Sequence, residues 1–559
     1  MTIFKRFFLS GLFVFMCFVL LNPNPFSNNP DIIWDESYFL TSSLSAIENA
    51  TLPGWDFPAS GAYYGGPQTY IDTAALVPIL GIVLVTSDFS ITEAKLWVAQ
   101  YTGELLHILR LVSGMAALLI LVFFFFFFKK KQIPHSLALS LSLFLLLLVS
   151  DVLVIEFLHT AKMWAFYILF LIIPSVFFIA QEYYFSHLDK PFIRKEWYVA
   201  LLVWSSVLMF FQSWVGVLSV ALLMLYALLL RHISVRDIWE HARRYWLLLI
   251  LFSLTQISFV YQAYRVAHTF ASTTRTSEGA IDWFARLTKP LVYTVQGQPL
   301  SIVFLISILT LLFFALYNKS FFADSRRRMY ISIACVHPVL VYFIFYVCIG
   351  LDLLPRYAVV LTMACSFSVA LLMTEFGRRA TIATLTLSGL LFMIVSVHTL
   401  QLYWQPSSET VLLNTIRDKY NTSNNVFITE HSARRMTLPV NAESLLLLDE
   451  ERSAMSRFAF LLQHQDMVKA RGEFKPIAIT AYRDEQMTAA LERFAKGTNS
   501  VWVITRKCDT MCSVKEIQQG TCFQINTNAC GIAPQEVNTL PVFLSSTQLG
   551  YSYVVRKMY

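Results

Sequence analysis

Charged residues are scarce in this chain: Asp, Glu, Lys and Arg make up 14% of its 559 residues, whereas 56% are hydrophobic. A soluble globular protein carries about 25% charged residues, so the composition does not fit an ordinary soluble enzyme. The apolar residues are gathered in blocks before position 400, and the remainder has the composition of a soluble domain. The basic residues lie mostly between these blocks, so membrane topology explains the net charge of +7 better than nucleic-acid binding does.

Several patterns of known chemistry are missing as well. The sequence after position 400 has no phosphate-binding loop and no catalytic triad, and the chain has no cluster of metal ligands at regular spacing. It also has no internal repeat, a feature that many transporters carry. These absences leave the short polar motifs beside the apolar blocks as the candidates for chemistry.

The apolar blocks predict about eleven membrane-spanning helices, because a helix needs about 20 mostly apolar residues to cross a bilayer. The predicted spans are 7–21, 107–128, 136–155, 163–180, 198–212, 214–230, 246–262, 299–317, 329–349, 357–375 and 380–399. The run 198–230 is too long for one crossing, so we divide it at Gln212-Ser213-Trp214. Thr73–Val85 is apolar but too short to cross, and we expect it to lie in the membrane interface.

The distribution of Lys and Arg predicts the orientation. Basic clusters such as Lys129–Lys131 and Arg326–Arg328 fall on one side of the predicted spans, and few basic residues fall on the other. Cytoplasmic loops carry this excess, so the N-terminus is predicted inside and the part after position 400 outside. No small-x-small cleavage site follows the first span, which favours a retained anchor over a signal peptide. A bacterial-type plasma (inner) membrane is favoured over the endoplasmic reticulum.

Two domains follow from this division. Residues 1–400 form an all-α polytopic membrane domain with an outer loop at 22–106, and residues 401–559 form an extracytoplasmic α/β domain. In the second domain, hydrophobic runs predict strands and amphipathic runs predict helices. The predicted strands are Val426–Thr429, Pro476–Thr480 and Val501–Thr505, with a terminal hairpin of Val542–Ser546 and Tyr551–Arg556; the predicted helices are Ala442–His464 and Asp484–Lys496.

The eight cysteines divide in the same way. Cys17, Cys335, Cys348 and Cys365 fall in or beside spans and are predicted to be buried thiols. The other four, Cys508, Cys512, Cys522 and Cys530, lie in the outer domain. An oxidising compartment would let them form two disulfides in any of three pairings. A zinc site is the alternative, although the C-x3-C spacing is loose for zinc and no His lies nearby.

A pair of carboxylates follows the first predicted span at Asp35-Glu36. The simple interpretation is that Asp35 caps a helix in a solvated position. The surrounding loop is rich in aromatic residues, among them Tyr38 and Tyr64, which suit both a membrane interface and the apolar faces of sugars. Gly65-Gly66-Pro67-Gln68 then predicts a tight turn before the short apolar helix.

The order of these motifs resembles that of GT-C glycosyltransferases, especially protein O-mannosyltransferases and the aminoarabinose transferases of lipid A. Those families carry an acidic pair after the first span, an Arg followed by small residues at the next span, and a late outer Arg-Tyr. Here the matching positions are Asp35-Glu36, Arg110 with Ser113-Gly114, and Pro355-Arg356-Tyr357. The resemblance covers positions 1–400 in order and topology. A Pro-Pro-Leu-type entry to the juxtamembrane helix is replaced here by Gly66-Pro67-Gln68, which leaves the subfamily open.

The resemblance implies a sugar transfer from a polyprenyl phosphate with inversion at the anomeric carbon. Asp35 would be the general base that takes the proton of the acceptor hydroxyl, and Glu36 would orient the acceptor. Arg356 would grip the leaving phosphate, and Tyr357 would add a hydrogen bond. The alternative for Arg356 is a side chain that snorkels at the end of a span. No cofactor is certain, and Asp35 and Glu36 as ligands of a divalent cation stay possible.

Three further residues are candidates for the donor site, and Asp151, Tyr38, Tyr64 and Gln68 are other candidates for the site. Arg110, His159 and Lys162 are candidates for binding phosphate, although each has a structural alternative as an interfacial or capping residue. Asp151 lies near the outer end of the third predicted span, where an ionisable group is a functional candidate by default.

Two other functions share many of these features. A transporter or flippase of lipid-linked sugars would show intramembrane charges, broken helices or an internal repeat. An O-antigen-type polymerase or ligase would carry its Arg and His residues in large outer loops. We therefore predict a glycosyltransferase whose partners are the bilayer, a polyprenyl-phosphate-linked sugar and a lipid, glycan or protein acceptor, with no nucleic acid.

Overall fold

A computed structural model describes most of the membrane domain and the central part of the C-terminal domain. The described residues are 36–55, 65–100, 102–129, 133–151, 154, 157–158, 160–161, 163–264, 283–297, 325–348, 357–374, 382–390, 393–394, 408–420, 425–430, 479–482, 500–505, 511–525 and 552–558. The predicted span 7–21, the span 299–317 and the helices Ala442–His464 and Asp484–Lys496 lie outside them.

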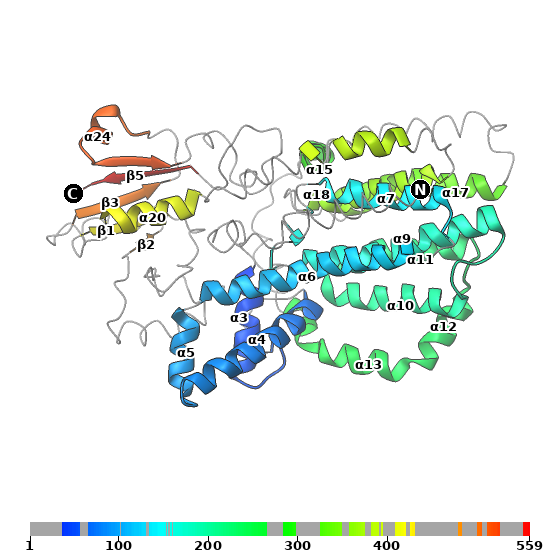
Figure 1. Ribbon diagram of the computed structural model, residues 1–559, viewed down its shortest axis with the longest axis horizontal. Helices are drawn as coiled ribbons and strands as arrows, with labels where there is room; N and C mark the ends of the chain where they lie inside the picture. Colours follow the sequence, from blue (N-terminus) through cyan, green and yellow to red (C-terminus); the bar gives the residue numbers. More distant parts are fainter. Residues whose placement is uncertain are drawn as a thin grey trace.

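A bundle of apolar helices forms the largest part of the molecule (Figure 1). Its members are α6 (Thr102–Lys129), α7 (His135–Val149), α9 (Trp164–Leu188), α10 (Lys195–Gln212), α11 (Trp214–Leu229), α17 (Ser325–Tyr342) continued by the π-helix η2 (Phe343–Cys348), and α18 (Ala358–Met373). Helix α9 contacts α6, α10 and α11 along its length. One continuous apolar core joins these helices, so the all-α prediction for the membrane domain is confirmed in its general character.

The predicted division of the run 198–230 is confirmed. Helix α10 ends at Gln212 and α11 begins at Trp214, and Ser213 between them is extended, with φ −162° and ψ 121°. The two helices pack against each other, and an ion pair of 2.6 Å between Lys195 and Asp237 joins the start of α10 to the helix that follows α11. The pair α10–α11 is therefore a hairpin that reverses at Ser213.

Helix α4 (Gly66–Thr86) corrects the prediction for Thr73–Val85. The helix begins at Gly66 rather than at Thr73, because Gly65 supplies a left-handed turn and Pro67 suits the first helical positions. Its 21 residues are long and apolar enough to cross a membrane, although only 22% of that window is buried. The statement that this segment is too short to cross was wrong.

The described residues contain part of the predicted set of spans. Four of their helices are long and apolar enough to cross a membrane, or five if Trp246–Thr255 and Ile257–Tyr264, bent by 56°, are one span. These helices identify an integral membrane protein, and the total of eleven stays a prediction. Helix α7 ends at Val149 rather than at 155. With 15 residues it is about 22 Å long, which is shorter than the hydrocarbon layer.

A mixed sheet of five strands forms the C-terminal part, in the order β2-β1-β3-β5-β4. The strands are β1 (Asn425–Glu430), β2 (Ile479–Tyr482), β3 (Ser500–Thr505), β4 (Cys522–Ile525) and β5 (Tyr553–Lys557). Strand β1 pairs in parallel with β2 and β3, and β5 pairs antiparallel with β3 and β4. Helix α20 (Ser408–Tyr420) packs Leu412 and Ile416 onto Phe427 and Trp502, so it covers one face.

The pairing of β5 contradicts the predicted terminal hairpin. Both edges of β5 are occupied, one by β3 and the other by β4, so no edge is left for Val542–Ser546, which lies outside the described residues. Strand β4 was not predicted, because its four residues are too few to show an alternating pattern. The three other predicted strands are confirmed, with β2 displaced towards the C-terminus.

Of the four outer cysteines, Cys512 and Cys522 form a disulfide that joins the loop before α24 (Val514–Gln518) to β4. Cys508 and Cys530 lie outside the described residues. In the membrane domain Cys335 and Cys365 are buried free thiols, as predicted, whereas Cys348 is exposed. The disulfide bears out one of the bridges that the sequence predicts.

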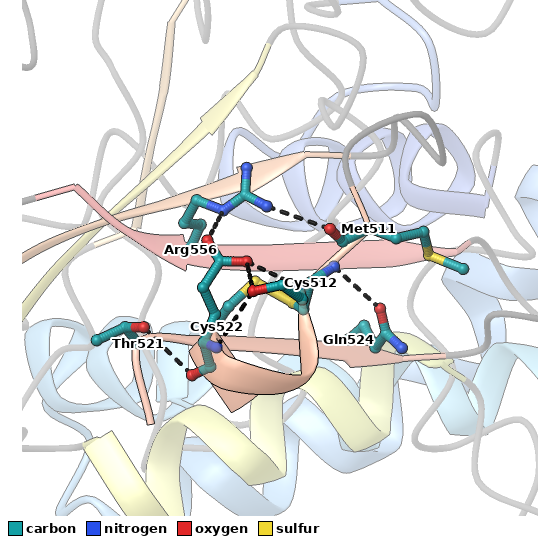
Figure 2. A network of polar contacts seen from close by, with 8 residues as sticks. Met511, Cys512, Thr521, Cys522, Gln524 and Arg556 are labelled. Carbon is teal, nitrogen blue, oxygen red and sulfur yellow. Dashed lines mark hydrogen bonds and ion pairs between the residues drawn. A yellow bond between two sulfur atoms is a disulfide. The ribbon is translucent and has the colours of Figure 1, made fainter. Parts of the chain in front are cut away.

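Polar contacts surround this disulfide (Figure 2). Arg556 of β5 makes an ion pair of 3.0 Å with Glu516 and donates to the carbonyl of Met511. Glu516 also accepts from the backbone N–H and the hydroxyl of Ser513, which closes a capping box at the start of α24. Hydrogen bonds from Ser513, together with Arg556, hold the pKa of the Glu516 carboxyl below its usual range. The disulfide and this ion pair therefore attach α24 to the sheet from two sides.

Replacing Cys512 and Cys522 by Ser should loosen this part of the sheet. Closing the loop between them is worth about 2–3 kcal/mol in the chain-entropy account, so amide exchange in α24 and β4 should accelerate in the full-length protein. Hydrogen exchange read by mass spectrometry measures this. Cys348→Ser, which removes an exposed free thiol of the membrane domain, is the control, and unchanged exchange in the double variant would contradict the role of the disulfide.

Candidate functional site

A group of buried amides joins four helices at one end of the bundle. We call Gln68, Ser113 and Gln212 the Gln68 cluster. The Gln68 side chain donates to Ser113 Oγ (3.4 Å), and its backbone N–H donates to Gln212 Oε1 (3.2 Å). Gln212 Nε2 donates to the carbonyl of Met163 (2.8 Å) and to Gln68 Oε1 (3.4 Å). The three side chains are fully buried or nearly so, and they tie α4 to α6, to the start of α9 and to the end of α10.

Gly65 brings α3 (Glu36–Glu48) to the same place. Its φ of 73° lies in the left-handed region, and its N–H donates to the carbonyl of Gln212 (2.9 Å). A Cβ on Gly65 would overlap the ring of Phe39, which is fully buried. Phe39 lies one turn after Glu36, so the first turn of α3 packs beside the Gln68 cluster.

The bent segment Trp246–Tyr264, which follows helix α12 (Val235–Arg244), packs against the other side of α4. A Cβ on Gly66 would overlap the amide of Gln256, the residue at which Trp246–Thr255 and Ile257–Tyr264 are bent. Tyr70 donates to the carbonyl of Thr255. The same segment holds the outer loop, since Ser258 donates to Pro53 (2.7 Å) and Gln262 to Gly54 (3.1 Å). The segment from Thr255 to Gln262 therefore contacts the outer loop both before and after residues 56–64.

Two buried charged residues lie one turn away from the Gln68 cluster. Asp72 follows Gln68 by four residues on α4, and Arg110 precedes Ser113 by three residues on α6. These spacings place each pair on one face of its helix. Asp72 is 0% exposed and Arg110 is 5% exposed, so Arg110 does not snorkel to solvent. The sequence prediction missed Asp72, although its spacing from Gln68 was a signal that could have found it.

Tyr357 approaches from the far end of the chain. It is the N-cap residue of α18, and its ring packs edge-on against Trp164, with centroids 5.6 Å apart. Trp164 follows Met163, whose carbonyl accepts from Gln212. The backbone carbonyl of Tyr357 accepts from the hydroxyl of Tyr346 (2.6 Å). A chain of contacts thus connects the start of α18 to the Gln68 cluster.

The remaining predicted site residues fall into three groups. Asp151 is fully buried just after the end of α7. Glu36 and Tyr38 belong to α3, but their side chains lie outside the described part. Asp35, Tyr64, His159, Lys162 and Arg356 also lie outside the described residues.

Within the described ranges no three His, Cys, Asp or Glu side chains are grouped so that they could hold a metal ion. The side chains of Asp35 and Glu36 lie outside these ranges. The use of a divalent cation therefore stays open.

Comparisons with known proteins give only distant structural likenesses. No family model matches the chain, and no curated protein matches it in sequence. Among solved structures, the chain is similar to ArnT from Cupriavidus metallidurans in the apo state, at 12% identity and TM-score 0.42, covering 91% of this chain and 94% of that one. The same protein bound to undecaprenyl phosphate gives 11% identity, TM-score 0.41 and 98% coverage of both chains.

The archaeal oligosaccharyltransferase AglB from Archaeoglobus fulgidus, in complex with an inhibitory peptide and a dolichol-phosphate, is also similar. It gives 10% identity and TM-score 0.43, covering 90% of this chain and 70% of that one. At these identities and TM-scores, function has to be argued from the residues of this chain.

Gly65→Ala should destabilise the protein. The left-handed conformation costs a residue with a Cβ about 1–2 kcal/mol, and the added carbon also overlaps Phe39. Thermal unfolding in detergent measures the loss. Gly81→Ala is a matched control in the same helix, because a Cβ there meets nothing within 4 Å, and a helical Gly→Ala change favours the helix. Equal melting temperatures for the two variants would contradict the close packing at Gly65.

Proposed function

We propose that the chain is a glycosyltransferase that moves a sugar from a polyprenyl-phosphate donor to an acceptor at the outer face of the membrane. Asp35 acts as the general base, Glu36 orients the acceptor, and Arg356 receives the leaving phosphate. Arg110, Gln68 and Tyr357 support the donor side of the site. The proposal rests on the motif order in the sequence and on the arrangement of the described residues that flank those motifs.

One observation supports it most. Four segments that carry the motifs are far apart in the sequence, yet they meet around the Gln68 cluster. Phe39 anchors the first turn of α3 on Gly65, Ser113 anchors the face of α6 that carries Arg110, and the Tyr357 ring packs on Trp164. Asp35 directly precedes α3 and Arg356 directly precedes Tyr357. We therefore propose that Asp35 and Arg356, the sequence neighbours of these segments, act at this end of the bundle.

The chemistry follows from the residue types. The acceptor hydroxyl transfers its proton to the Asp35 carboxylate while its oxygen forms a bond to the anomeric carbon. The bond from that carbon to the phosphate oxygen breaks, and the polyprenyl phosphate leaves with the electron pair. The charge that develops on the phosphate needs a cation held in place beforehand. A guanidinium such as that of Arg356 offers two parallel donors to the phosphate oxygens.

A transporter or flippase of lipid-linked sugars is the second candidate, because two features match it. The apolar segment bent by 56° at Gln256 is a broken helix, and Glu182 and His232 form a buried hydrogen-bonded pair. Their positions favour the transferase, however. Gln256 contacts Gly66 at the candidate site, whereas His232 follows the end of α11 at the opposite end of the bundle. Transporters place such features together near the middle of the membrane.

Asp35→Asn should abolish transfer while leaving the fold intact. Loss of a general base lowers turnover about 10²–10⁴-fold, and the isosteric amide should keep donor binding. The assay uses purified protein in lipid with a panel of radiolabelled polyprenyl-phosphate sugars. Asp88→Asn, the same change at an exposed residue that follows α4, is the matched control. Transfer by the Asp35 variant at the wild-type rate would rule out this role, and movement of donor across the bilayer without transfer would support the flippase.

Arg356→Gln should weaken donor binding. A hydrogen bond to a charged group contributes about 1.5–3 kcal/mol, which corresponds to roughly a 10–100-fold rise in the dissociation constant for a polyprenyl phosphate. Equilibrium binding of the leaving group itself, undecaprenyl phosphate, measures it without turnover. Lys289→Gln, at an exposed residue of helix α15 (Trp283–Gly297), is the control. Unchanged affinity in the Arg356 variant would contradict a role in phosphate binding and favour the alternative, a side chain that snorkels at the end of a span.

A further inference from the structure

We infer that helix α12 (Val235–Arg244) is a binding surface for anionic lipid headgroups, at the face of the membrane opposite the candidate site. It follows α11 and precedes the apolar helix α13 (Trp246–Thr255). Both neighbours are apolar throughout, which sets α12 at the level where the chain leaves and re-enters the membrane. This inference is independent of the proposed function.

The two faces of α12 differ in a way that fits an interface. Ile238 packs against the core of the bundle. Val235 and Trp239 belong to the same apolar arc but are 72% and 68% exposed, so half of the apolar face has no protein cover. Arg236 and Arg243, which are also exposed, border one side of this arc. A basic helix with an apolar face and a Trp is the pattern of helices that lie on a membrane surface.

Three contacts hold α12 in this orientation. His232, just before the helix, pairs with the buried carboxylate of Glu182 on α9, and the ring of Phe185 stacks on it at 4.4 Å. Ser234 and Asp237 form a capping box at the first turn. Asp237 also pairs with Lys195 at the start of α10. The exposed face is therefore presented by a fixed helix rather than by a loose segment.

Exposed tryptophans around α12 indicate the level at which this helix lies relative to the lipid headgroups. Trp197 near the start of α10 is 70% exposed and Trp246 at the start of α13 is 57% exposed. Helix α12 contacts both α10 and α13, so these two residues and Trp239 belong to one neighbourhood. In Figure 1, α12 lies between the neighbouring ends of α10 and α13. Tryptophan is enriched at the level of lipid headgroups, which supports a place in the interface for all three.

The charge identifies the lipid. Residues 231–244 contain four arginines against two carboxylates. Both carboxylates are already paired, Asp237 with Lys195 and Glu240 with Arg236. Arg243 and Arg244 are exposed at the end of the helix, where the chain turns into α13. Basic residues at a membrane surface attract anionic lipids about fivefold for each charge. The surface therefore suits an anionic headgroup better than a zwitterionic one.

The test measures which lipid touches Trp239. The full-length protein is reconstituted in phosphatidylcholine vesicles that contain the same molar share of either brominated phosphatidylglycerol or brominated phosphatidylcholine. Bromine quenches tryptophan fluorescence on contact. The part of the quenching that disappears in Trp239→Phe belongs to Trp239. We expect this part to be about twofold or more greater with the anionic lipid, and the preference to disappear in the double variant R243Q/R244Q.

The matched control removes the same charge elsewhere. Lys515→Gln with Lys557→Gln neutralises two exposed residues of the C-terminal domain and should keep the lipid preference. Equal quenching by the two lipids in the wild-type protein, or a preference that survives R243Q/R244Q, would overturn the inference. Absence of quenching of Trp239 by either lipid would also overturn it, because the face would then not lie at the bilayer.

Discussion

The arrangement depends on the side chain of Gln212. Backbone groups inside a membrane have no water to bond, so each open donor or acceptor costs several kcal/mol unless the protein satisfies it. The reversal at Ser213 and the starts of α4 and α9 leave such groups close together. The main-chain carbonyl of Gln212 accepts a hydrogen bond from the N–H of Gly65. Its side-chain oxygen accepts from the N–H of Gln68, and its side-chain nitrogen donates to the carbonyl of Met163. One residue, through its side-chain amide and its main-chain carbonyl, thereby satisfies the ends of several helices and fixes their relative positions.

Gln212 also illustrates which features could be predicted from the sequence and which could not. The break was predictable, because a mostly apolar run of 33 residues, 198–230, is too long for one crossing. The partners of Gln212 were not, since they come from positions near 65, 113 and 163, and nothing local in the sequence connects these. The start of α4 at Gly66 was missed for a related reason. Its first residues are polar or small. They become helical because Gln212 and Ser113 accept hydrogen bonds from the backbone and the side chain of Gln68.

The candidate site shows the same division between local and long-range information. Gln68, Arg110 and Tyr357 were identified from short motifs, and the described contacts bring their segments together. Asp72 was missed, because a single carboxylate in a helix looks like an ordinary polar residue unless its spacing of four from Gln68 is considered. In the C-terminal sheet, the longer hydrophobic strands were predicted, whereas strand order and the short strand β4 depend on pairing with β5. Pairing between strands far apart in the chain leaves little trace in a single sequence.

Helix α10 connects the two polar ends of the bundle. Its 18 residues make a rod of about 27 Å, close to the thickness of the hydrocarbon layer. At one end Gln212 positions α4 and the candidate site, and at the other Lys195 holds Asp237 of α12. Between these ends the helix packs against α9 and α11 through apolar contacts. Because those contacts are non-directional, the polar anchors at the two ends set the height of α10, and with it the distance between the candidate site and the surface of α12.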